Sequence, residues 1–66
     1  MRHGEVIRIY PHGTVMIWDM RMERSYPFYG DTALHIGEGV LFATDADDKI
    51  VVRVERLARG SKEQLR

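Results

Sequence analysis

Hydrophobic residues along this chain recur in short runs separated by turn-forming residues, which is the pattern of β-strands. The first two runs, residues 5–10 and 14–20, are rich in β-branched side chains and flank the segment Pro11-His12-Gly13. Proline fixes its own φ angle and glycine accepts a positive φ, so this segment favours a three-residue turn. The pattern therefore predicts a β-hairpin over residues 4–22, around which we expect the rest of the chain to be organised.

Three further strands are predicted after this hairpin. Residues 25–29 are dense in aromatic side chains but include Pro27, which restricts a strand to a sheet edge or a bulge. We expect a turn to follow at Gly30-Asp31. Residues 40–44 and 49–57 flank an acidic turn and predict a second hairpin.

Alternation within the strands predicts which side chains face the core. In the last strand, Ile50, Val52 and Val54 form the cleaner apolar set and are expected to point inward. In the second strand, Met16 and Trp18 share one face. Core packing is the expected role of Met16, whereas we expect Trp18 to be partly exposed because its indole N–H needs a partner.

Five short strands predict an all-β fold, a five-stranded small barrel with every strand antiparallel. Consecutive apolar positions in the first two strands fit a closed barrel, whose strands are covered on both faces. The two standard architectures of this size are the OB fold and the SH3-like barrel, and the strand pattern leaves both open. We expect one domain over residues 1–57 and a polar, frayed tail over residues 58–66.

Composition narrows the class of protein. The chain has 66 residues and no cysteine, which excludes disulfides and fits a reducing compartment. No apolar run exceeds four residues, whereas a membrane span needs about 20. Strand-like sequence begins almost at once, with no apolar signal segment. We therefore expect a cytoplasmic protein without a membrane partner.

The net charge of the chain weakens the expectation that it binds nucleic acid, although it does not exclude binding. Ten basic and ten acidic residues give a net charge of zero, whereas many nucleic-acid binders are strongly basic. A local basic face with aromatic side chains can still hold a single strand. Eight of the ten basic residues are arginines, which stack on bases and contact phosphates with two N–H groups.

Motifs that carry chemistry are missing from the sequence. It has no nucleophile elbow, phosphate loop or metal-binding helix. His3, His12 and His35 are scattered and lack the spacing of a metal site. The acidic turn lacks the glycine and glutamate that a calcium loop requires. We expect a protein that is not an enzyme and carries no metal or cofactor.

Cold-shock domains resemble this chain in the spacing of glycine and apolar residues at two places. Gly4 and Val6 are similar to the opening of their first strand. The entry to their fourth strand is matched by Leu34, Gly37, Val40 and Phe42. The resemblance covers residues 4–57 in outline, and it implies an OB fold that binds single-stranded nucleic acid.

Residues 12–17 depart from the second-strand motif of cold-shock domains, because only Gly13 and Ile17 match and both stacking aromatic residues are lost. The chain is also similar to bacterial translation initiation factor one and to the soluble OB domain of NfeD-type proteins, which is an interaction module. The similarity to the initiation factor lies in residues 4–7, Pro11, Gly37 and Val40, and the similarity to the NfeD-type domain lies in residues 11–15, Gly37 and Val40. The three resemblances share a fold, and a fold does not settle a function.

An OB barrel binds oligonucleotides on the face of its early strands, where aromatic rings stack on bases and arginines contact phosphates. The candidate nucleic-acid-binding residues are Arg8, Tyr10, Trp18, Arg24, Tyr26, Phe28, Tyr29 and Arg53. Trp18 and Phe28 would equally complete a small core. We expect binding of single-stranded RNA or DNA with low sequence specificity. The alternative is a protein-interaction module or homodimer that uses the aromatic patch 26–29, or an edge strand, without nucleic acid.

Overall fold

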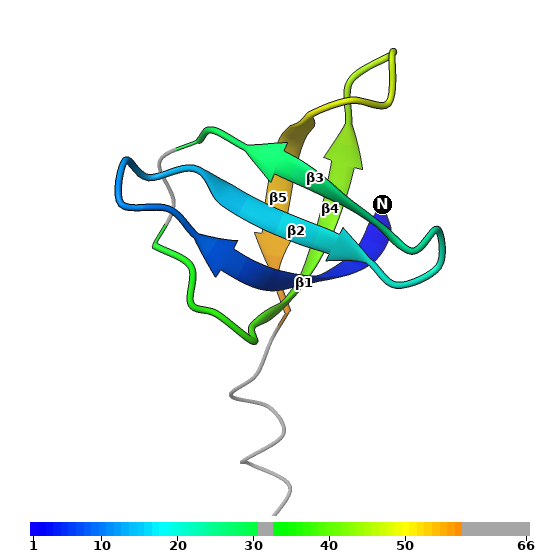
Figure 1. The fold of residues 1–66 in the computed structure, drawn as a ribbon. Helices are drawn as coiled ribbons and strands as arrows, with labels where there is room; N and C mark the ends of the chain where they lie inside the picture. The colour runs from blue at the N-terminus through cyan, green and yellow to red at the C-terminus, as the bar shows by residue number, and fades with distance from the viewer. Residues whose placement is uncertain (31–32, 58–66) are drawn as a thin grey trace, which may run out of the picture.

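The computed structural model describes residues 1–30 and 33–57, and it confirms the five predicted strands to within a few residues. They are β1 (Arg2–Ile9), β2 (Val15–Asp19), β3 (Arg24–Phe28), β4 (Gly39–Thr44) and β5 (Val51–Arg56) (Figure 1). Asp31 of the predicted turn and the predicted tail, residues 58–66, lie outside the described residues. In the part of the chain that the structure describes, no helix is long and apolar enough to cross a membrane.

The strands close into one barrel in the order β1-β2-β3-β5-β4. β1 is central, because it pairs antiparallel with β2 on one side and with β4 on the other. The predicted all-β small barrel is therefore confirmed. The expectation that every strand is antiparallel is wrong for one pair, since β3 and β5 run parallel and meet only at Phe28 and Val51.

The parallel contact arises because the chain forms two separate antiparallel units. β1, β2 and β3 form a meander, and β4 and β5 form a hairpin that pairs with β1 through β4. β5 then reaches the far side of the meander in the direction of β3. Pro27 lies in β3, whose second edge is paired only at Phe28, so its predicted place at a sheet edge is confirmed.

The first hairpin turns as predicted. The Tyr10 N–H donates to the Thr14 carbonyl, and the Gly13 N–H donates to the Tyr10 carbonyl, each over 2.9 Å. Gly13 has a φ of 104°, a backbone conformation that residues with a Cβ atom rarely adopt. Glycine at this position therefore lets β1 reverse into β2 within three residues.

The barrel interior holds one apolar core, which is formed by side chains from every strand and from the β3–β4 connection. Its buried members are Val6, Val15, Ile17, Tyr26, Phe28, Leu34, Val40, Phe42 and Val51. Gly4 is buried as well, and a Cβ there would lie 2.7 Å from a methyl carbon of Ile17. The core is thus packed against the bare backbone of β1.

The predicted core positions are wrong at Met16 on β2 and at Val52 on β5, whereas Val54 packs against the core as predicted. Met16 faces away from the core, because Val15 and Ile17 on either side of it are the buried residues of β2. On β5, Val51 is buried while Val52 is 56% exposed. Bulges explain part of this difference, since the pairing of β5 with β4 skips Val52 and so changes the face on which later residues lie.

Candidate nucleic-acid interface

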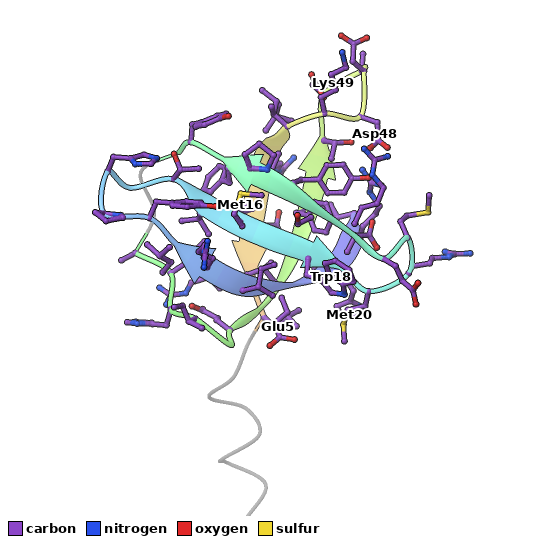
Figure 2. All side chains as sticks on the ribbon, viewed as in Figure 1. Glu5, Met16, Trp18, Met20, Asp48 and Lys49 are labelled. Atoms are coloured by element: carbon purple, nitrogen blue, oxygen red, sulfur yellow. The ribbon has the colours of Figure 1, made fainter. Side chains whose placement is uncertain are left out.

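The outer surface of β1, β2 and β3 carries the half-buried side chains of Met16 and Trp18. Met16 pairs with Arg8 on β1, and Trp18 pairs with Glu5. Residues directly opposite each other share a face of the sheet, so these four side chains form one outward row. Figure 2 shows Met16 and Trp18 along β2, with Glu5 on the neighbouring strand. The predicted partial exposure of Trp18 is confirmed.

A stack of three flat side chains extends this row into the β1–β2 turn. The Cζ atom of Arg8 lies 5.4 Å from the centroid of the Tyr10 ring. The Tyr10 and His12 rings are 5.4 Å apart at their centroids and inclined by only 12°. Arg8 forms no ion pair with any carboxylate of residues 1–30 and 33–57. Its positive charge is thus available beside an aromatic platform.

Tyr29 lies near the same end of the barrel. Its side chain is 65% exposed, which makes it the most exposed aromatic side chain in the described part of the chain. Together with His12 it borders a hollow of about 520 Å³ at the mouth of the barrel. The structure thereby brings Arg8, Tyr10 and Tyr29, predicted from sequence, close to one turn.

Tyr26 and Phe28 do not belong to this surface. Their exposed fractions are 1% and 8%, and both rings lie in the core. The Tyr26 and Phe42 ring centroids are 5.9 Å apart, so Tyr26 packs against β4 across the barrel. Neither ring presents a face on which a base could stack, and we remove both from the candidate site.

Arg24 is engaged at the opposite end of the barrel. Its guanidinium lies 5.0 Å from the Tyr26 ring centroid and 3.6 Å from a carboxylate oxygen of Asp48. Asp48 also accepts hydrogen bonds from Arg2, at 2.6 Å, and from the Tyr26 hydroxyl, at 3.1 Å. Hydrogen bonding from Arg2 and then Thr44 holds the pKa of Asp48 below its usual value. This network balances the charge of Arg24 within the protein.

Arg53 lies on a different surface. It belongs to β5, which has no pairing with β1 or β2, and its guanidinium is 3.1 Å from the carboxylate of Glu55. The predicted site residues therefore separate into an outer group, a core pair and two arginines elsewhere. The outer group, which we call the Arg8 surface, consists of Arg8, Tyr10, His12, Met16, Trp18 and Tyr29.

The β4–β5 turn is acidic, because Asp45, Asp47 and Asp48 outnumber its single cation, Lys49. Asp45 accepts hydrogen bonds from the backbone N–H groups of Lys49, at 2.8 Å, and Ile50, at 3.2 Å. These bonds hold the pKa of Asp45 below its usual value, so the turn carries negative charge at neutral pH. An anionic ligand is consequently favoured at the β1–β2 turn and not at this one.

His12 and Met16 are the members of the Arg8 surface that were not among the residues predicted from sequence. The His12 ring stacks on the ring of Tyr10, two residues earlier. The spacing aromatic, proline, histidine, glycine across a tight turn is the signal that indicates such a stack. No three histidine or carboxylate side chains gather into a metal site among the residues that the structure describes.

Comparison of the chain with protein-family models, curated proteins and solved structures finds no match.

Proposed function

We propose that this chain is a non-enzymatic OB-type barrel that binds single-stranded RNA or DNA, with little sequence preference, on the Arg8 surface. The strand order supports the OB assignment, because β4 pairs with β1 and β5 instead of continuing the meander from β3 as in an SH3-like barrel. OB folds bind oligonucleotides on the face of their second and third strands and on the loops that join the first to the second and the fourth to the fifth strand. The Arg8 surface covers the second strand and the first of these loops, whereas the β4–β5 turn is acidic. A cytoplasmic location remains a prediction from composition.

One observation carries this proposal, namely the stack of Arg8, Tyr10 and His12 at the β1–β2 turn, on the same outer face of the sheet as Met16 and Trp18. Aromatic rings bind single-stranded bases in a way that tolerates any sequence, because every base has a flat π-face. Arg8, which has no carboxylate partner among residues 1–30 and 33–57, supplies the contact with the phosphate backbone. Glu5 on the same face opposes this charge, so we expect weak binding that is sensitive to salt.

The test is a titration with short oligouridine and oligothymidine strands, followed by the fluorescence of Trp18, which is the only tryptophan. We expect saturable quenching that weakens as salt increases. Replacing Tyr10 by leucine keeps apolar bulk but removes the stacking ring, and should weaken binding by about 1–3 kcal/mol. Arg8→Ala should lower the magnitude of the logarithmic salt slope by about 0.7, the value for one phosphate contact on a single strand.

Arg21→Ala is the matched control, because Arg21 is also exposed and its loss changes the net charge equally, but it lies in the β2–β3 turn. Equal effects of Arg8→Ala and Arg21→Ala would mean that only overall charge matters, which contradicts a defined surface. If the wild-type protein binds no oligonucleotide at low salt, the proposal is wrong and an interaction module becomes the better interpretation.

A further inference from the structure

One edge of β5 has no partner strand among the described residues beyond its first position. β5 pairs with β4 along its length, but its other edge meets β3 only through the bridge between Val51 and Phe28. Residues 52–56 thus present an open edge. Such an edge is a template for pairing with another strand, and proteins usually protect it with charged side chains.

Hydrogen bonding to β4 shows which backbone groups point to the open edge. The Leu57 N–H donates to the Gly39 carbonyl over 3.4 Å. In an antiparallel pair, successive residues direct their backbone groups to opposite sides, so Glu55 also faces β4. Val54 and Arg56 therefore direct their N–H and C=O groups away from β4, toward the open edge.

Opposite charges lie on either side of Val54. Arg53 and Glu55 are both exposed, and they form an ion pair with each other over 3.1 Å. Val52, before them, is 56% exposed although it is apolar. Arg53, Val54 and Glu55 are thus positive, apolar and negative in turn. A second copy of this segment running antiparallel places a positive residue opposite a negative one on each side of Val54.

We propose that the open edge of β5 pairs with the same edge of a second copy of this chain, antiparallel and centred on Val54. In this register the Val54 residues of the two copies exchange their N–H and C=O groups. Arg53 then lies opposite Glu55 of the second copy, and the symmetry repeats this ion pair. Both pairs occupy positions without backbone hydrogen bonds between the two strands, where facing side chains approach most closely.

Charge also selects this register over its neighbours. Moving the centre of symmetry by one residue places either Arg53 opposite Arg53 or Glu55 opposite Glu55 of the second copy. Like charges directly opposite each other destabilise a sheet. The two-fold arrangement around Val54 is the register that satisfies both the backbone groups and the charges.

This surface is separate from the Arg8 surface. β5 is not paired with β1 or β2, so the dimer leaves the outer face of the meander uncovered. The inference does not depend on nucleic-acid binding, and its test uses the size of the protein alone.

The experiment measures the mass of the full chain by sedimentation velocity and light scattering over a wide concentration range. We expect a reversible dimer for the wild type. Arg53→Glu places like charges opposite each other at both pairs, as does Glu55→Arg, and each should weaken dimerisation by about tenfold or more. The double variant Arg53→Glu/Glu55→Arg exchanges the charges and should restore the dimer.

Mixing the two single variants provides the sharpest result. Each is expected to be monomeric alone, but an equal mixture should form a heterodimer, because the two glutamates of one chain face the two arginines of the other. This recovery also shows that the monomeric variants are folded. A wild type that stays monomeric at every concentration leaves the edge to another occupant and overturns the proposal. Single variants that remain dimeric overturn it as well.

Discussion

At the scale of single residues, this barrel depends on a few positions where no other residue type fits the local structure. Gly4 illustrates this, because β1 crosses the core there without a side chain. A Cβ at Gly4 would approach Ile17 to 2.7 Å, a ring carbon of Phe42 to 2.8 Å and the Trp18 carbonyl to 2.9 Å. All three contacts are with atoms of fully buried side chains or of the backbone, which cannot move independently.

Gly4→Ala should therefore destabilise the barrel by about 1–3 kcal/mol, the usual cost of overfilling a packed core. Urea unfolding followed by Trp18 fluorescence measures this loss. Gly39→Ala is the matched control, because among the described residues its added Cβ meets only the flexible end of Leu57 within 4 Å, at 3.1 Å. Equal losses for the two variants would show that the close contacts at Gly4 do not control stability.

At the scale of elements, the turns are held by side chains as much as by the strands that they join. Asp19 at the end of β2 is fully buried, and its Oδ1 accepts hydrogen bonds from the backbone N–H groups of Arg21, at 2.9 Å, and Met22, at 3.1 Å. Its Oδ2 lies 3.3 Å from the guanidinium of Arg2 on β1. One carboxylate thus fixes the β2–β3 turn and joins it to the first strand.

Asp19→Ala should cost about 2 kcal/mol, because two turn amides lose their acceptor and Arg2 loses a partner. Asp19→Asn keeps an oxygen for both amides but replaces the Oδ2 that accepts from Arg2 with an NH2 donor, so about half of this loss is expected. Thermal unfolding of the two variants measures the difference. An asparagine variant as unstable as the alanine variant would mean that the ion pair with Arg2 dominates.

Most elements were predictable from sequence because their signals are local. The strands follow from β-branched runs, and the first turn follows from proline and glycine at adjacent positions. The face of Val52 was not predictable, because the bulge there depends on how β5 pairs with β4. The candidate site was predicted only in part. Burial of Tyr26 depends on the closed barrel, and the stacking of His12 on Tyr10 depends on the geometry of the β1–β2 turn.

At the scale of the whole molecule, buried and bridging carboxylates make the barrel sensitive to acid. Glu38 is buried, accepts hydrogen bonds from Arg56 on β5 and from the backbone N–H of His35, and joins the β3–β4 connection to the last strand. Hydrogen bonding from Arg56, and then from His35, holds the pKa of Glu38 below its usual value of 4.5. Asp48 has a lowered pKa for a similar reason, through Arg2 and Thr44.

A carboxyl group whose pKa is lower in the folded than in the unfolded state stabilises the fold at pH values above its unfolded pKa. That contribution is lost as the pH falls through the folded pKa. We therefore expect the melting temperature to be constant near neutral pH and to fall below the usual glutamate pKa of 4.5. Glu38→Gln should lower the melting temperature at neutral pH and make its decline in acid shallower.

Glu23→Gln is the control for this experiment, since Glu23 is exposed and its carboxylate accepts no hydrogen bond from the described residues. Its acid profile should follow that of the wild type. An unchanged profile for Glu38→Gln would assign the acid sensitivity to the aspartates.

The central position of β1 has a consequence for the speed of folding. The meander and the β4–β5 hairpin are local structures, whereas the pairing of Arg2 with Phe42 joins residues forty positions apart in the chain. Contacts between distant residues form slowly, because the chain must lose the entropy of the intervening loop before it gains the contact. We infer that docking of the hairpin on β1 limits the folding rate. Lengthening the β3–β4 connection should then slow refolding more than lengthening either tight turn.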